Sequence, residues 1–277
     1  MNIIEVVKSN LDKLTKSEYV VATHFIKNPN DFAFETLDSV AVKINTSTTS
    51  VLRFCRKNGF SGYKAFQDEV RGSFKYQLTL PDKLKIASEN ADDMSFSKPA
   101  YNAISCIEKT FNSISPDHMS YAVDEILNAN RLFCFGLKES FALAHYAYTR
   151  FLTIRSDVFM LTSGHSGEIE SLLSLKKDDV CMFYLFHRYT KQSPKILEQI
   201  KKQGTKVVLI TNPPYDELEK YASIVLPCFV DINGIKNSAA APVCLTDCLC
   251  NMAVSRSNTE ILDYMKKSES LFMNFTL

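Results

Sequence analysis

The stretch of sequence that decides the fold reads TSTTSVLRFCRKNGFSG and runs from Thr46 to Gly62. It opens on five consecutive hydroxyl residues, Thr46 to Ser50, whose short polar side chains favour helix N-termini over helix interiors. Three basic residues follow on the same predicted helix: Arg53, Arg56 and Lys57. Asn58-Gly59 then ends the helix, since this pair is typical of a helix C-cap.

The pattern around this stretch is that of a helix-turn-helix, in which two short helices pack across a tight turn. A preceding helix is predicted for residues 36–44, and Ala41 supplies the small residue that close packing of two helices needs. Asn45 stands at the turn and tolerates a positive φ better than other non-glycine residues. Ser47 is the expected N-cap of the second helix. Four apolar residues form the expected packed face: Val40, Ile44, Val51 and Phe54.

A recognition helix that begins with small hydroxyl residues can bring its backbone close to DNA. The local charge agrees, because residues 43–75 hold seven Lys/Arg against two Asp/Glu in a chain of formal net charge +1. The alternative is that the hydroxyls only cap a helix and the basic side chains are solvated. We predict the following DNA-binding residues: Ser47, Thr48, Thr49, Ser50, Arg53, Arg56 and Lys57.

Helices flank this motif and complete a small helical domain, predicted for residues 1–76. The segment LTKSEYVVATHFIKN has helical spacing, with Thr15 and Glu18 as a capping box, and it stops at Asn28-Pro29-Asn30. A further helix is expected over residues 62–74. Residues 77–100 are polar, contain two prolines and have little periodicity, so we predict a linker there.

The rest of the chain, residues 101–277, has a different pattern. Short continuous apolar runs alternate with helix-length segments, which is typical of parallel strands buried on both faces. Five runs are predicted as strands: 131–136, 157–164, 178–186, 205–211 and 223–228. The predicted fold is therefore an all-α helix-turn-helix domain followed by a three-layer α/β domain with a doubly wound parallel sheet.

Two segments carry a resemblance to a known family: LTKSEYVVATHFIKNPNDF, residues 14–32, and SVAVKINTSTTSVLRFCRKNGFSGYKAFQ, residues 39–67. They resemble the N-terminal domain of RpiR-type bacterial transcription regulators. The family usually has Gly where Asn45 stands, and "TVVRFCRKLGFSG" where this chain has SVLRFCRKNGFSG. Family members pair this domain with a sugar isomerase (SIS) domain, which implies a SIS-like fold for residues 101–277.

The resemblance also implies a phosphosugar site at the carboxyl ends of the strands. The family's usual GxGxS turn corresponds to residues 136–140, where Lys138 replaces the second Gly. Its SxSGxT loop corresponds to residues 185–190, where both serines and the Gly are gone. The implied ligand-binding residues are Gly136, Lys138, Ser140, Ser163, His165, His187, Arg188 and Thr190. His187 and Arg188 are candidates for charge-assisted bonds to an anion.

No catalytic residue is predicted. SIS isomerases resemble one another in using Glu and His, and the helix expected over residues 237–256 has no Glu and a single carboxylate, Asp247. We interpret the α/β domain as a sensor. Five apolar residues of that helix are candidates for a subunit interface or for the internal core: Ala239, Ala240, Ala241, Leu245 and Leu249.

Composition excludes several other classes of protein. The chain of 277 residues is 45% hydrophobic and 23% charged, which is typical of a globular protein. No secretory signal or membrane-length apolar run is visible, so we expect a cytoplasmic protein. The eight cysteines are expected to be reduced and structural, and the group at Cys244, Cys248 and Cys250 lacks the paired spacing and nearby His of a zinc site. We expect no metal and no cofactor.

The sequence thus predicts a DNA-binding transcription regulator of sugar or amino-sugar metabolism. Its expected partners are a double-stranded DNA operator, a phosphorylated sugar or amino sugar, and further copies of itself in a homodimer or homotetramer. One alternative is a regulator whose α/β domain only dimerises. The other is a sugar-phosphate isomerase with an accessory DNA-binding domain.

Overall fold

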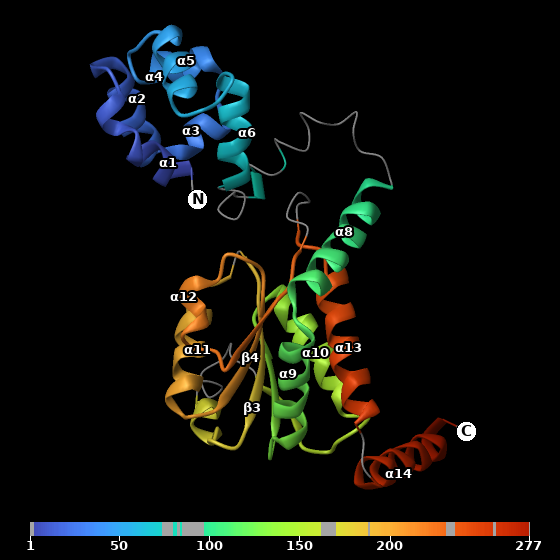
Figure 1. The fold of residues 1–277 in the computed structure, drawn as a ribbon. Helices are drawn as coiled ribbons and strands as arrows, with labels where there is room; N and C mark the ends of the chain where they lie inside the picture. The colour runs from blue at the N-terminus through green and yellow to red at the C-terminus, as the bar shows by residue number, and fades with distance from the viewer. Residues whose placement is uncertain are drawn as a thin grey trace. The chain divides into compact units, whose positions relative to one another are not determined.

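The structure is a computed structural model of the whole chain. It describes residues 3–73, 80–81, 84, 97–161, 170–187, 189–230, 236–256 and 259–276. The chain divides into two compact units, Met1–Ala91 and Asp92–Leu277 (Figure 1). Most of the predicted linker, residues 77–100, lies outside the described residues. Among the described helices, none is long and apolar enough to cross a bilayer.

The first unit is helical, as predicted. Its elements are α1 (Ile3–Ser9), a 3-10 turn (Leu11–Lys13), α2 (Lys16–Lys27), α3 (Pro29–Phe34), α4 (Leu37–Lys43), α5 (Thr48–Lys57) and α6 (Tyr63–Ser73). The predicted capping box is confirmed, because the Thr15 N–H donates to Glu18 Oε2 at 2.8 Å. Helix α2 ends just before Pro29, as expected. Helix α3 then begins at Pro29 itself, because proline is compatible with the first position of a helix.

Four buried phenylalanines form the centre of this helical unit: Phe25, Phe32, Phe54 and Phe66. Phe66 meets two of the other rings edge to face, with centroids 5.0 Å apart for Phe25 and Phe66 and 5.2 Å apart for Phe54 and Phe66. Because Phe54 lies on α5 and the others on α2, α3 and α6, the cluster fixes the orientation of α5 within the unit.

The second unit is an α/β fold, which confirms the predicted class. Its strands are β1 (Leu132–Gly136), β2 (Val158–Leu161), β3 (Val180–Leu185), β4 (Lys206–Thr211) and β5 (Ile224–Pro227). Its helices are α8 (Lys98–Ser113), α9 (Pro116–Asn128), α10 (Glu139–Phe151), a 3-10 turn (Glu170–Ser174), α11 (Gln192–Lys202), α12 (Asp216–Glu219), α13 (Ala240–Ser255) and α14 (Thr259–Thr276). The five strands are parallel in the order β2-β1-β3-β4-β5.

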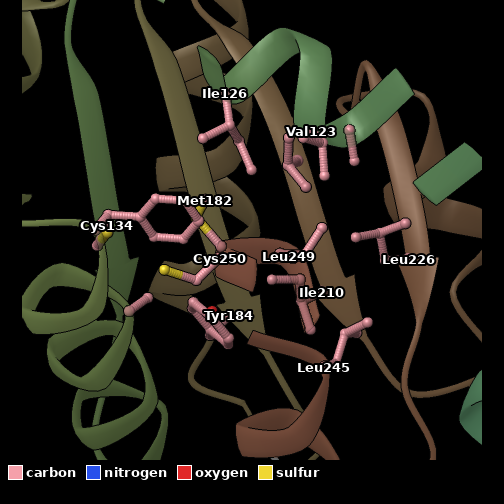
Figure 2. Packing of buried hydrophobic residues seen from close by; sticks show 14 of the residues in the cluster. Val123, Ile126, Cys134, Met182, Tyr184, Ile210, Leu226, Leu245, Leu249 and Cys250 are labelled. Atoms are coloured by element: carbon pink, nitrogen blue, oxygen red, sulfur yellow. The ribbon is translucent and has the colours of Figure 1, made fainter. Parts of the chain in front are cut away.

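Helices cover both faces of the sheet because alternate side chains of each apolar strand point to opposite faces. On one face the strands pack against α9, α10 and α13; Figure 2 shows part of that cluster, including Met182, Tyr184 and Ile210 of the strands beside Ile126 of α9 and Leu249 of α13. On the other face, a second cluster joins the strands to α11 and α12. Figure 1 shows these two layers.

Helix α13 contributes mainly to this internal core. Ala241, Leu245 and Leu249 are at most 1% exposed and belong to the same cluster as the residues of the sheet and α9. Figure 2 shows Leu245 and Leu249 in this cluster. Of the two roles that the sequence left open for these three residues, internal core is therefore correct, and they offer no surface to a second subunit. Ala239, by contrast, is exposed.

The start of α10 lies almost against the end of β1. A Cβ added to Gly136 would lie 2.2 Å from the carbonyl oxygen of Ser140, which is backbone and therefore unable to move aside. Only glycine permits this close approach, and the approach places the first turn of α10 over the carboxyl end of β1.

We predict that Gly136→Ala lowers the free energy of unfolding of the α/β unit by about 3 kcal/mol or more, because the added methyl group collides with backbone. The matched control is Gly72→Ala on the exposed side of α6, where an added Cβ meets nothing within 4 Å. That change is expected to be neutral or to stabilise by about 0.5–1 kcal/mol. Denaturant unfolding measures both, and equal effects of the two substitutions would contradict the prediction.

Candidate DNA interface and effector site

The helix-turn-helix has the predicted local geometry at its turn. Asn45 adopts φ +51°, and the Thr46 N–H donates to the Ala41 carbonyl at 2.9 Å. Ser47 is the N-cap of α5: its hydroxyl accepts the Ser50 N–H at 3.1 Å, and the two hydroxyl oxygens lie 2.9 Å apart. The predictions for Asn45 and Ser47 are thus confirmed as to their structural roles.

Helix α5 presents a polar stripe to solvent. Thr49, Arg53 and Arg56 are exposed and are spaced by four and three residues, so they lie on one face. On the opposite face, Val51 and Phe54 are fully buried. Thr48 and Ser50 are half-buried at the edge of the stripe. Of the residues predicted to bind DNA, the structure therefore brings Thr49, Arg53 and Arg56 together on an accessible surface.

Lys57, also predicted to contact DNA, has a structural role that the sequence did not reveal. Its ammonium group donates to Glu18 Oε2 at 2.8 Å and to the Lys13 carbonyl at 2.9 Å. The Glu18 side chain is only 3% exposed, whereas that of Lys57 is 39% exposed. The pair ties the end of α5 to the start of α2, 39 residues earlier in the chain.

The Glu18 carboxylate is held ionised by these contacts. Burial raises its pKa, but hydrogen bonds from Lys57 and from Thr15 more than compensate, so the net pKa is lowered. Because the folded-state pKa lies below the unfolded value of about 4.3, this stabilisation is complete above that pH. It is lost as the pH falls through the lower, folded-state pKa.

In the sheet of the α/β unit, the chain passes from β1 to β2 in one direction and from β3 to β4 in the other. The strand order therefore reverses between β1 and β3, and the carboxyl ends of these two strands flank that point. Open α/β sheets bind ligands in the crevice at such a point. Lys138 lies on the β1 side, is exposed and adopts φ +53°, a conformation that favours glycine. Ser140 is 9% exposed in the first turn of α10.

On the β3 side, His187 is fixed by Asn212. The His187 N–H donates to Asn212 Oδ1 at 3.0 Å, and His187 Nδ1 lies 3.2 Å from the same oxygen. Asn212 Nδ2 donates to the Pro213 carbonyl, which fixes the orientation of the amide, so Nδ1 of His187 must carry a hydrogen. Asn212 is 1% exposed and was not identified from the sequence, where an Asn after a strand is an ordinary turn residue.

Burial lowers the pKa of His187, so the imidazole is neutral at pH 7. In the protein without ligand His187 therefore carries no positive charge at that pH, and a charge-assisted bond to an anion requires the imidazole to take up a proton on binding. Thr190 lies close by, with its hydroxyl oxygen 3.1 Å from that of the buried Ser193 at the start of α11. The other predicted ligand residues, Ser163, His165 and Arg188, lie outside the described residues.

The single carboxylate of α13 is already paired. Asp247 Oδ1 accepts the Tyr146 hydroxyl at 2.7 Å and lies 3.0 Å from Arg150 Nε, and both partners belong to α10. These contacts join two helices of the same layer, which is a structural role. Among the described residues, no group of His, Cys, Asp and Glu could hold a metal ion.

Each of the two units matches a known protein-domain family. The helix-turn-helix domain of the rpiR family matches residues 1–77, and the SIS domain matches residues 125–252. The chain belongs to the RpiR family. A transcriptional regulator of the helix-turn-helix type from Caldanaerobacter subterraneus is 22% identical over 276 residues, covering 98% of this chain and 96% of its own. The regulator HexR of Escherichia coli is 22% identical over 274 residues, covering 96% and 93%.

Two solved structures share the fold. The Vibrio vulnificus NanR protein, complexed with ManNAc-6P, has a TM-score of 0.57 at 20% identity and covers 99% of each chain. The sugar isomerase domain of an RpiR transcription factor from Sphaerobacter thermophilus has a TM-score of 0.58 at 19% identity, covering 63% of this chain and 99% of its own. With its relatives named as transcriptional regulators, this RpiR-family chain is a regulator and not an enzyme.

The Lys57–Glu18 pair generates a prediction about stability. Lys57→Ala should lower the free energy of unfolding of the helical unit by about 1–3 kcal/mol, because it leaves a buried carboxylate without its cation. The control is Lys64→Ala, which breaks a pair with Asp68 whose side chains are 71% and 56% exposed. That change should cost no more than about 0.5 kcal/mol.

Thermal unfolding of both variants at neutral pH distinguishes the two pairs. The difference between Lys57→Ala and the unchanged protein should also shrink as the pH falls through the lowered, folded-state pKa of Glu18, where the carboxylate takes up a proton and no longer needs a cation. An effect of Lys57→Ala as small as that of Lys64→Ala would show that the pair is not a structural tie.

Proposed function

We propose that this RpiR-family regulator reads DNA with the stripe formed by Thr49, Arg53 and Arg56, and that a phosphorylated sugar or amino sugar bound by the α/β unit controls this binding. The observation that carries the DNA part is the single exposed face of α5, where two guanidinium groups and a hydroxyl stand opposite a fully buried apolar face. An α-helix of this kind fits the major groove of B-form DNA.

Residues along the stripe have different roles in this proposal. Arg53, in the middle of α5, pairs with a guanine or a phosphate, whereas Arg56, one turn later, contacts the phosphate backbone. Thr49 and its neighbours Thr48 and Ser50 lie at the leading end of the helix, where hydroxyls bond to phosphates or base edges. In a homodimer, two such helices read half-sites separated by about 34 Å or a multiple of it.

The proposed effector binding rests on the loops that follow β1 and β3, at the point where the strand order reverses. The start of α10 and the exposed Lys138 offer positive charge to a phosphate, and Thr190 at the start of α11 offers a hydroxyl. The named ligand of the NanR complex, ManNAc-6P, supports an amino-sugar phosphate as the first compound to test. Bound effector changes DNA affinity only if it binds two arrangements of the protein with different affinities.

A second candidate is a regulator whose α/β unit binds no metabolite. It is favoured by the neutral His187 and by a side chain, Lys138, where the related turn has glycine. The effector experiment below distinguishes the two candidates.

On DNA, Arg53→Ala should weaken operator binding by about 1–3 kcal/mol and relax specificity at one base pair, because a bidentate guanine contact is lost. Arg56→Ala should weaken binding to all DNA sequences alike. It should also reduce the slope of log K against the logarithm of the salt concentration by about 1, the value for one phosphate contact. Fluorescence anisotropy on operator and scrambled duplexes over a salt series measures both effects.

The control is Lys8→Ala, which removes an exposed cation of α1 on the same unit. It should leave operator affinity and the salt slope unchanged. Unchanged operator affinity in the Arg53 variant would show that this residue is not in the interface. Equal losses of affinity in all three variants would show only nonspecific attraction between the basic side chains and DNA, and would contradict a specific interface on α5.

For the effector, a phosphorylated amino sugar at about 100 times its dissociation constant should stabilise the α/β unit by about 2.7 kcal/mol. A thermal-shift series on the full chain compares sugar phosphates, amino-sugar phosphates and their unphosphorylated forms. Lys138→Ala should reduce the shift for the phosphorylated compound without lowering the stability of the free protein. A series in which no compound shifts the transition favours the regulator that binds no metabolite.

A further inference from the structure

Two residues just before α13, Lys236 and Asn237, contact both loops of the proposed effector site. Lys236 forms an ion pair with Glu139, the first residue of α10 on the β1 side. Asn237 Nδ2 donates a hydrogen bond to the carbonyl of His187 on the β3 side. Because these contacts lie on opposite sides of the point where the strand order reverses, residues 236–237 lie across the crevice. Neither residue was predicted from the sequence to belong to the site.

The contact of Asn237 fixes the place of Lys236. Its acceptor, His187, is itself held by the buried Asn212, which follows β4 and accepts the His187 N–H at 3.0 Å. The backbone at Lys236 is therefore held close to the start of α10, and its ammonium group can change partner without a movement of the chain around it.

The ion pair of Lys236 with Glu139 is one that an entering anion can replace. Its side chains are 63% and 54% exposed, so the pair is in contact with water and contributes little to stability. The Lys57–Glu18 pair of the helical unit differs in this respect, because its carboxylate is only 3% exposed. Exchange of partners at Lys236 leaves no buried charge behind.

We propose that Glu139 competes with the phosphate group of the effector for Lys236. In the free protein the carboxylate of Glu139 pairs with the ammonium group, and on binding the phosphate group takes its place. This inference rests on the proposed binding of a phosphorylated sugar and adds a regulatory element to it. The ion pair raises the concentration of effector to which the protein responds.

The charges favour the exchange for a phosphorylated compound only. A phosphate monoester carries a charge of about −1.5 to −2 at pH 7 and has three acceptor oxygens, whereas a carboxylate carries a single negative charge. The exposed Lys138, at the N-cap of α10, adds a second positive charge at the same end of the helix. An unphosphorylated sugar has no charge with which to displace Glu139.

The first experiment is a calorimetric titration of the full chain with two probes: ManNAc-6P, which is the ligand named in the NanR complex, and inorganic phosphate. Glu139→Gln should lower the dissociation constant of both by about threefold or more, because the competing carboxylate is lost. The unphosphorylated form of the sugar should bind no better to the variant than to the parent.

Glu198→Gln is the matched control. It removes the same charge and breaks an exposed pair with Lys202, 2.8 Å long, whose side chains are 41% and 63% exposed. Glu198 lies within α11, away from its first turn, so the dissociation constants should not change. Equal affinities of the parent and Glu139→Gln, or equal gains in the two variants, overturn the proposal.

The second experiment is a double-mutant cycle that tests whether Glu139 acts through Lys236. Lys236→Gln should weaken binding of ManNAc-6P by about threefold or more, because a charge-assisted bond is lost. Adding Glu139→Gln to that variant should give a smaller gain than in the parent, since the carboxylate then withholds no lysine. A full gain without Lys236 would show that Glu139 only repels the phosphate, and would contradict the competition.

Thermal unfolding of the ligand-free proteins tests a structural role for Glu139, since a carboxylate in the first turn stabilises a helix. Glu139→Gln and Glu198→Gln should unfold at nearly the same temperature. A lower unfolding temperature of Glu139→Gln with unchanged affinity assigns the residue to helix stability and overturns the proposal. If the parent binds ManNAc-6P and Glu139→Gln binds it equally well, this inference alone fails. If neither protein binds either phosphate compound, the proposed effector binding fails as well.

Discussion

The α/β unit depends on one constraint: its central strands are apolar on both faces. Every residue of β1 and β3 is buried, so each face of the sheet has to be covered by helices, and connections between parallel strands provide them. Polar side chains can then stand only where strands end. Lys138, His187 and Thr190 all follow the carboxyl ends of strands for this reason, and the reversal of strand order between β1 and β3 separates the two loops that hold them.

The helical unit holds a short exposed helix, α5, in a fixed orientation. Phe54 anchors the buried face of α5 in the aromatic cluster, and Lys57 ties its end to the buried Glu18. Arg53 and Arg56, which point to solvent, therefore stand on a helix fixed at two places. A rigid support matters here because a contact to a base edge depends on position far more than a contact between surface charges does.

The features that the sequence predicted well are local ones. Asn45 at the turn, Ser47 as N-cap and the capping box at Thr15 each depend on residues within a few positions, so short-range propensities were sufficient. The continuous apolar strands were predictable for the same reason. The Glu18–Lys57 and His187–Asn212 contacts join residues 39 and 25 positions apart, and they exist only once the helices and strands have packed. The sequence predicted other roles for Glu18, Lys57 and His187, and it did not identify Asn212 at all.

Helix packing offers a physical route from the start of α10 to helix α14. Ser140 lies in the first turn of α10 against the end of β1, and α10 is joined to α13 by the hydrogen bond of Tyr146 and the ion pair of Arg150 with Asp247. Helix α13 leads along the chain to α14, whose first turns pack on the same core. A ligand that moves the start of α10 would therefore also move the base of α14. A bound ligand alters the spacing of two DNA-binding units in a dimer only to the extent that it prefers one dimer arrangement over the other, and that difference in affinity limits the size of the regulatory effect.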